Sequence, residues 1–428
     1  MTFESYRQIF QNRSFRLFWS GFSFSVLGDT MTRVALTWFV YEATRSAEAL
    51  GWLMICYTGP IIVGGLLAGT LLDRFDRRAV MVVDNVVRGL AVALVPLLYA
   101  LGRLEVWHVY AVAAVYGLLM MISLAGGPSL VPSLVPREQL ATANALEMLS
   151  WTLGGVIGPA LAGVLIVWVG APNVVIVDAV SYFAFALALA RTRLADEPRE
   201  AHEAGGQTYH LRHAVQLLLK NRVLLSTTLM FMAFNIGGGA LSVWLPILSD
   251  QVLGGGPRLY GALLGVLALG EVVSALLAGG LALALSLGTL ICLAQALSGV
   301  SLGLVLAGQN AWVVGLALAL FGACSSPLTI WAQTLRMQII PERLRGRSFA
   351  LLRMLMQSGN PIGGALAGLL LPTLGLTAMI SLSALVVGLP GLIGYRVREL
   401  RLAGGRGDSV AEAAHSVERG NMPEGERA

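Results

Sequence analysis

The sequence predicts an all-α membrane protein in which twelve transmembrane helices form two pseudo-symmetric halves of six helices each. Composition is the first observation: the 428 residues are 56% hydrophobic and only 12% charged, whereas a soluble domain is roughly 25% charged. Nearly uncharged runs also recur along the chain, each of about 20 residues, which is the length that crosses a bilayer. The third observation is that these runs repeat.

The repeat is clearest in two segments that share one offset. The stretch AVYGLLMMISLAGGPSLVPSLVP from Ala114 aligns without gaps with ALFGACSSPLTIWAQTLRMQIIP from Ala319, a shift of 205 residues. The same shift carries the segment that begins at Gly154 onto the segment that begins at Gly359. Two similar halves, each too apolar for water, are a common construction of membrane transporters. The repeat therefore favours a transport protein over an enzyme.

The expected elements follow in order along the chain. A cytoplasmic arm at 1–16 precedes the first half at 17–190, whose spans are expected at 17–41, 50–72, 79–101, 106–127, 140–168 and 173–190. A polar cytoplasmic linker at 191–222 leads to the second half at 223–395, whose spans are expected at 223–248, 260–282, 286–307, 311–333, 348–372 and 376–395. The cytoplasmic tail at 396–428 is rich in Gly, Glu, Arg and Ser, a composition typical of disorder.

Arginine and lysine gather in the loops of one membrane side, which orients the bundle by the positive-inside rule. The loops on that side carry Arg7, Arg13, Arg16, Arg74, Arg77, Arg78, Arg137, Arg191, Arg193, Arg212, Lys220, Arg222, Arg343, Arg345, Arg347, Arg396, Arg398 and Arg401. The opposite side carries only Arg45, Arg103 and Arg258. Both termini are therefore expected in the cytoplasm, and the net charge of +5 does not indicate a nucleic-acid partner.

No pattern indicates a cofactor, a metal site or a catalytic centre. Cys56, Cys292 and Cys324 fall inside apolar runs, where reduced packing residues are expected rather than a disulfide framework. The chain has no GxxxxGK[ST] phosphate loop. The N-terminus has no small-residue cleavage site before its first apolar run, so a retained first helix is expected rather than a signal peptide.

The segment GTLLDRFDRR, from Gly69 to Arg78, resembles the signature loop of the major facilitator superfamily. The resemblance covers nearly the whole chain, through twelve spans, two six-span halves and a long central loop. Within that superfamily, LGDTMTRVALTWFVYEATRS in the first span and LVPREQLATANAL before the fifth resemble a branch that includes bacterial enterobactin exporters and macrolide efflux proteins. This resemblance implies a transporter fold and places the protein in a bacterial inner membrane.

The resemblance gives the loop between the second and third spans the role of a cytoplasmic latch that holds one alternating state. Its members are Gly69, Asp73, Arg74, Asp76, Arg77 and Arg78. Gly69 would permit close helix approach, and an acid of the loop would stabilise a helix N-terminus, with span eleven beginning near Arg347. The alternative is simple positive-inside anchoring of the loop.

The fifth span carries a motif that resembles the one distinguishing exporters in the superfamily. It consists of Gly154, Gly158, Pro159 and Gly163, although Ala162 stands where a glycine is usual. Small residues at four-residue spacing give a smooth helix face, and Pro159 removes a helical hydrogen bond. The alternative is generic close packing, which the related glycines of the second half favour.

Ionisable residues inside hydrocarbon are costly and are functional candidates by default. Asp29 and Arg33 lie one turn apart on the first span, so they are expected to share a face and can pair, although the sequence does not decide whether pairing or desolvation governs the Asp29 carboxyl group. Asp29 is the leading candidate for proton or cation coupling, with Arg33 tuning it or binding an anionic substrate. The alternative is a structural ion pair.

Further charged residues lie in other spans. Glu271, in the middle of the eighth span, is the second candidate for coupling or for a cationic substrate, the alternative being a protonated structural residue. Glu147 and Arg353 are expected to form contacts between the halves. Asp84 and Arg88, at the same spacing as Asp29 and Arg33, are interpreted as structural partners of the signature loop. Asp178, near the outer end of the sixth span, is interpreted as structural too. The fourth span lacks the arginine found in many proton-coupled exporters of the superfamily.

The sequence thus predicts a secondary active transporter that works as a monomer in the lipid bilayer of a bacterial inner membrane. The expected activity is proton-coupled export of an amphipathic small molecule (a siderophore, a macrolide or another drug) by alternating access, with no cofactor. The alternatives are an uptake or metabolite permease of the same fold and a membrane receptor that does not transport.

Overall fold

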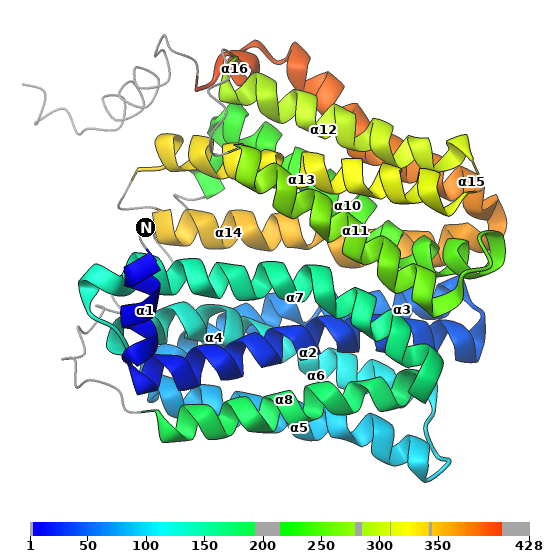
Figure 1. Cartoon of the computed structure of the whole chain (residues 1–428). Coiled ribbons are helices and arrows are strands. Elements are labelled where there is room, and N and C mark those ends of the chain that lie inside the picture. Colours follow the sequence, from blue (N-terminus) through cyan, green and yellow to red (C-terminus); the bar gives the residue numbers. More distant parts are fainter. Residues whose placement is uncertain (1–2, 193–214, 279–284, 309, 342–344, 405–428) are drawn as a thin grey trace, which may run out of the picture.

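The computed structural model describes residues 3–192, 215–278, 285–308, 310–341 and 345–404. All regular structure in these residues is helical, which confirms the predicted all-α class (Figure 1). Most of the predicted linker (193–214) and of the predicted tail (from 405) lies outside the described residues. The two predicted halves form separate bundles that lie against each other, one above the other in Figure 1.

The long helix α2 of the first bundle starts at an N-terminal cap. Asn12 accepts hydrogen bonds from Ser14 N and Phe15 N at the start of α2 and donates one to Leu134 O. Such a cap satisfies the orphan N–H groups of a helix start. The helices of this bundle are α1 (Phe3–Gln11), α2 (Arg13–Thr44), α3 (Ala47–Thr58), α4 (Ile61–Arg74), α5 (Arg77–Ala100), α6 (Val106–Leu130), α7 (Leu140–Val169) and α8 (Ala171–Arg191).

The second bundle repeats this order with one fusion. α15 joins the two predicted last spans, and the joint is Gly375, whose φ of 79° is non-helical and suits glycine. The helices of this bundle are α10 (Arg222–Ile247), the π-helical turn η3 (Leu248–Val252), α11 (Gly256–Ala278), α12 (Leu287–Leu304), α13 (Ala311–Ile339), α14 (Arg345–Gln357), α15 (Gly359–Arg396) and α16 (Arg398–Leu402).

Ten segments of the described residues are long and apolar enough to cross a membrane, against the twelve predicted spans. Two features account for the difference. The segment Leu351–Arg396 counts once although it turns at Gly375. The 32-residue α2 is not among the ten because Asp29, Arg33 and several serines lower its hydropathy, although at 1.5 Å per residue it is long enough to span.

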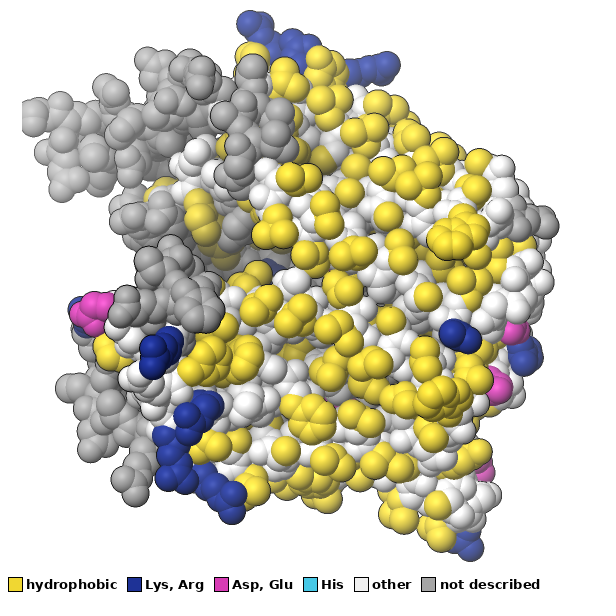
Figure 2. Space-filling model, in the orientation of Figure 1, with side chains coloured by type: hydrophobic (Ala, Val, Ile, Leu, Met, Phe, Trp, Pro, Cys, Tyr) yellow, Lys and Arg dark blue, Asp and Glu magenta, His cyan; other side chains and the backbone are white. Residues whose placement is uncertain are grey.

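The outer surface of both bundles is apolar. Leucine, valine, isoleucine and tryptophan side chains lie exposed along the helices, with Trp168, Leu276 and Trp312 more than three-quarters exposed. Figure 2 shows this apolar surface over both halves, with charged side chains gathered near its ends. A soluble monomer does not expose patches of this size, so the surface is suited to contact with lipid.

The two bundles meet at one end through glycines. We call the end where α2 begins the proximal end and the end where α2 stops the distal end. At the distal end α3 contacts α15 where Gly51 faces Gly368, and α7 contacts α11 where Gly163 faces Gly261. A Cβ on Gly261 would lie 2.2 Å from Pro159 O. Helices can approach this closely only because these residues lack side chains.

The exporter-like motif on α7 therefore consists of close helix contacts in this structure. Added Cβ atoms on Gly154 and Gly158 would meet Val26 and Thr30 of α2, inside the first bundle. Gly163 faces α11 of the other bundle. The motif thus fixes α7 between its own bundle and the second one, as the packing interpretation predicts.

We expect replacement of Gly158 by alanine to destabilise the protein. Its Cβ would lie 1.9 Å from Thr30 Oγ1, a hydroxyl that donates to Gly154 O. Overpacking of this kind costs about 1–3 kcal/mol, so the apparent unfolding temperature in detergent should fall. The matched control is Gly155→Ala on the same helix, whose Cβ would meet Ala268 Cβ at an ordinary 3.9 Å. Equal unfolding temperatures for the two variants would contradict the expectation.

Candidate functional site

The predicted latch loop makes its described contacts within its own bundle. Asp76 caps α5 by accepting a hydrogen bond of 2.7 Å from Ala79 N. Arg77 donates to Ser129 O at the end of α6, at 3.2 Å, and Arg78 donates to Ala190 O at the end of α8. Cations are favoured at helix C-termini, where carbonyl oxygens lack partners. The loop therefore ties together the proximal ends of α5, α6 and α8.

One expectation about this loop is not met, and another stays untested. A Cβ on Gly69 would have no atom within 4 Å, so Gly69 permits no close helix approach here. Asp76 caps its own helix, α5. The expected contact of a loop acid with the eleventh span near Arg347 stays a prediction, because the side chains at 342–347 lie outside the described part of the structure. Arg74 is exposed at the end of α4, and the side chain of Asp73 lies outside the described part of the structure.

Asp29 is bound by another helix and does not pair with Arg33. Tyr182 of α8 donates a hydrogen bond to Asp29 Oδ1. The ion pairs among the described residues are Arg45–Asp250, Arg88–Asp84 and Arg222–Glu399. The Asp29–Arg33 pair that the spacing allows is therefore not formed in this structure, and the carboxylate is bound by a hydroxyl of the neighbouring helix instead.

Arg88 connects Asp29 to a second carboxylate. Its Nη1 donates to the Tyr182 hydroxyl at 3.0 Å, and its Nη2 donates to Asp84 Oδ2 at 2.6 Å and to the Ser123 hydroxyl. The guanidinium carbon also lies 4.5 Å from the centre of the Tyr182 ring. Arg88 and Asp84 are each only 2% exposed. Their hydrogen-bond partners lie in the interior of the first bundle and not in the signature loop. The interpretation of Asp84 and Arg88 as partners of that loop is therefore corrected.

Asp178 lies against the same group of residues. It is 0% exposed, and its Oδ1 accepts a hydrogen bond of 3.2 Å from Ser181. A Cβ on Gly28 would lie 2.5 Å from this oxygen, so the carboxyl group is pressed onto α2 beside Asp29. The two carboxyl groups interact electrostatically. The sequence interpretation of Asp178 as purely structural did not anticipate this neighbour.

We call Asp29, Asp84, Arg88, Asp178 and Tyr182 the first-half polar cluster. It holds three carboxyl groups and one guanidinium, all inside a bundle with an apolar exterior. An unpaired buried charge is very costly, so a carboxyl group in such surroundings is stable when it is paired or protonated. With one cation present, the cluster is electrically neutral when two of its carboxyl groups hold protons.

The missing arginine of the fourth span has a counterpart in this cluster. Arg88 belongs to α5, the predicted third span, yet it reaches α6 through Ser123 and lies 5.8 Å from the ring centre of Tyr116. A guanidinium therefore lies between the helices of the first bundle although α6 supplies none. Only the repeated i, i+4 spacing of acid and arginine hinted at it in the sequence.

Arg33 and Glu271 lie where the two bundles face each other. Arg33 is exposed, and it interacts electrostatically with Tyr57 of α3 and with Tyr260 and Glu271 of α11. Glu271 is half-buried, and Ser325 of α13 donates to its Oε1 at 3.3 Å. The structure thus brings together one predicted site residue from each half.

The predicted inter-half contacts of Glu147 and Arg353 are not formed in the described residues. Glu147 is 6% exposed and lies inside the first bundle, where a Cβ on Gly127 of α6 would be 3.2 Å from its Oε1. Arg353 is exposed on α14. The correction has a steric reason, since Glu147 points toward α6 and not toward the other half.

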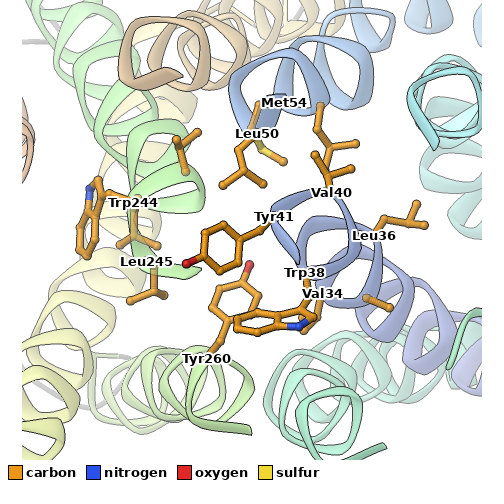
Figure 3. Close-up of a cluster of buried hydrophobic side chains, with 14 of the residues drawn as sticks. Val34, Leu36, Trp38, Val40, Tyr41, Leu50, Met54, Trp244, Leu245 and Tyr260 are labelled. Atoms are coloured by element: carbon orange, nitrogen blue, oxygen red, sulfur yellow. The ribbon is translucent and has the colours of Figure 1, made fainter. Parts of the chain in front are cut away.

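The contacts between the halves are at the distal end instead. Tyr41 donates to Asp250 Oδ2 at 2.8 Å, and Arg45 forms an ion pair with the same oxygen. Figure 3 shows Tyr41 and Trp38 of α2 beside Leu50 of α3 and Tyr260 of α11 in one buried apolar group. We call Tyr41, Arg45 and Asp250 the distal closure. Sequence reasoning missed it because its partners are 205 to 209 residues apart.

Comparison with known proteins identifies the family. A family model described as transmembrane secretion effector matches residues 6–415. The chain belongs to this family of the major facilitator superfamily. It is similar to an uncharacterised MFS-type transporter of Sinorhizobium fredii, with 28% identity over 81% of this chain and 86% of the relative. It is also similar to the enterobactin exporter EntS of Salmonella typhimurium, with 27% identity over 80% of this chain and 82% of the exporter.

Solved structures support the same fold. The nucleoside transporter NupG matches with a TM-score of 0.71 and 11% identity, over 90% of this chain and 99% of that one. A POT family transporter in complex with a thioalcohol-conjugated peptide matches with a TM-score of 0.67 and 15% identity, over 89% and 95%. The protein is therefore a multi-pass membrane transporter of small molecules and not an enzyme, as the sequence predicted.

We expect Arg88→Met to destabilise the protein strongly, because it leaves Asp84 buried without its cation. Loss of one partner of a buried ion pair costs about 3–5 kcal/mol. The double variant Asp84→Leu/Arg88→Met removes both charges and should recover most of the loss. The measurement is the apparent unfolding temperature in detergent. A double variant that is as unstable as Arg88→Met would contradict this account of the cluster.

We expect Asp250→Asn to weaken the distal closure. A partly exposed ion pair contributes roughly 0.2–1 kcal/mol, which is at most about fivefold in the ratio of two conformations. Spin labels at the distal ends of α3 and α15 should show a larger long-distance population. Arg222→Gln is the control, since the exposed ion pair of Arg222 with Glu399 joins two helices of the second bundle and does not connect the two bundles. Equal distance distributions for both variants would show that Asp250 does not stabilise the closed distal end.

Proposed function

We propose that this transporter exports an amphipathic small molecule, such as a siderophore, a macrolide or another drug, from a bacterial cell in exchange for protons. The observation that carries the proposal is the first-half polar cluster, with three carboxyl groups and one arginine inside a membrane-spanning bundle. Buried ionisable groups are costly to keep, and in transporters they form proton relays. The similarity to proteins named as enterobactin exporters supports the direction and the substrate class.

The structure has the form that one state of an alternating-access cycle requires. The distal end is closed by glycine contacts and by the distal closure, while Arg33 is exposed between the bundles. With both termini in the cytoplasm, this state opens to the inside and is ready to take up substrate. Rocking of the two halves about the region between them, where Arg33 and Glu271 lie, would then open the distal end to the outside.

Asp29 is the proposed coupling residue because of its position. It is the half-buried member of the cluster, on the helix that also carries Arg33, whereas Asp84 and Asp178 are almost fully buried. Protonation of Asp29 would remove one negative charge beside Asp178. It would also weaken the hydrogen bond that Tyr182 donates to Asp29. Since Tyr182 also binds Arg88, the change would reach α5 and α8 directly.

We expect Asp29→Asn to abolish gradient-driven export, since asparagine cannot exchange the proton. In everted membrane vesicles, accumulation of labelled enterobactin driven by a proton gradient should fall by at least about tenfold. Exchange of labelled for unlabelled substrate without a gradient should persist. Glu42→Gln is the matched control, because Glu42 is exposed on the same helix.

Three results would contradict parts of the proposal. Full gradient-driven activity of Asp29→Asn would move the coupling residue elsewhere, and Glu271→Gln would be the next variant. Transport that survives collapse of the proton gradient would remove the coupling. Labelled substrate that accumulates in intact cells that make the protein would indicate uptake instead of export.

A further inference from the structure

Arg33 differs in its surroundings from the other arginine inside the first bundle. It lies one helical turn beyond Asp29 on α2, and it is exposed where α3 and α11 of the two bundles approach it. The other arginine of the first bundle's membrane-embedded interior, Arg88, is almost fully buried and has a carboxylate, a serine and a tyrosine as partners. The two cations therefore have opposite surroundings within one bundle.

No carboxylate of the described residues lies within ion-pair distance of Arg33. The acid one turn away, Asp29, accepts a hydrogen bond from Tyr182 instead. A guanidinium stays charged in proteins and carries five N–H donors in a planar fork. That fork binds carboxylate and other anionic oxygen groups through two parallel hydrogen bonds. An exposed, unpaired fork between the bundles is thus suited to an anionic ligand.

Glu271 faces this position from the other bundle. It is close enough to Arg33 to interact electrostatically, but the two groups form no ion pair within 4 Å. Ser325 already donates to Glu271 Oε1, and the other carboxylate oxygen can accept from a ligand. Tyr57 and Tyr260, one from each bundle, also interact electrostatically with Arg33, but both are buried, so the ligand contacts argued here are those of Arg33 and Glu271.

We propose that Arg33 and Glu271 form a two-sided binding site for an organic anion that also carries a hydrogen-bond donor. Arg33 binds the anionic oxygens of the ligand, and Glu271 accepts a hydrogen bond from its donor group. The inference rests on the proposed function, because it names the substrate class of that transporter. It assigns substrate recognition to Arg33 and Glu271 and leaves the proton to the first-half polar cluster.

A ligand held in this way joins the two bundles. Its anionic end is bound to α2 of the first half and its donor end to α11 of the second. The empty site holds the two opposite charges apart, whereas the occupied site links them through the ligand. Binding therefore favours closer approach of the bundles, which alternating access needs before the distal end can open.

The test compares two fluorescent xanthene dyes with the purified protein in detergent. Carboxyfluorescein carries free carboxylates, and rhodamine 123 has its carboxyl group esterified and is cationic. Equilibrium binding is measured by fluorescence anisotropy for the wild type, Arg33→Gln, Arg33→Lys, Glu271→Gln and the control Arg103→Gln in the loop before α6. We expect Arg33→Gln to weaken carboxyfluorescein binding at least tenfold and rhodamine 123 binding less than twofold.

The other variants sharpen the result. Arg33→Lys keeps the charge but loses the planar fork, so it should bind carboxyfluorescein with intermediate affinity. Glu271→Gln should weaken binding less than Arg33→Gln, because an amide oxygen still accepts a hydrogen bond. Arg103→Gln should bind as the wild type does. Wild type that does not bind carboxyfluorescein, or Arg33→Gln that binds it normally, would overturn the proposal.

Binding and transport separate the two proposals. Arg33-dependent dye binding without any gradient-driven transport would sustain the anion site and contradict proton-coupled export. Gradient-driven export in vesicles that is unaffected by Arg33→Gln would sustain the transporter and contradict the anion site.

Discussion

The rest of this structure depends on one constraint, the burial of ionised groups inside helices that face hydrocarbon. Arg88 meets it with the Asp84 carboxylate, the Tyr182 hydroxyl and Ser123, which bind its two terminal nitrogens at almost no exposure. The positive charge of Arg88 in turn stabilises the nearby carboxylates of α2 and α8. The neutral Tyr182 hydroxyl accepts a hydrogen bond from Arg88 and donates one to Asp29, so it links the two residues. The cluster is thus a consequence of charge balance in a medium that solvates charges poorly.

Glycines allow the helices of that cluster to approach closely and also allow the two bundles to touch at the distal end. α8 can bring Asp178 against α2 only because Gly28 has no side chain, and α7 lies against α2 through Gly154 and Gly158. The same device closes the distal end, where Gly51 and Gly261 allow helices of opposite bundles to touch. Without a hydrophobic force between helices in lipid, close backbone contact supplies much of the association. Asp250 adds polar contacts with Tyr41 and Arg45 at the same end.

Sequence reasoning predicted the fold better than the partners of the site residues. Length, hydropathy and the repeat indicated a helical membrane transporter, which the structure and the family confirm. The spacing allowed Asp29 to pair with Arg33, because residues four apart share a helix face. It could not foresee Tyr182, which lies 153 residues away in the chain and belongs to another helix. Arg88 was recognised as charged but was interpreted as a structural partner of the signature loop.

The sequence by itself determined the membrane class, the duplicated halves and the list of costly residues such as Asp29, Arg88 and Glu271. It did so because hydrocarbon requires long apolar helices, so each charged residue within them stands out along the chain. Only the tertiary structure decided which charges are neutralised and which are left to face the other half. The physical reason is that a partner at hydrogen-bond distance is set by helix packing, through contacts such as Gly28 with Asp178, and not by spacing along one helix.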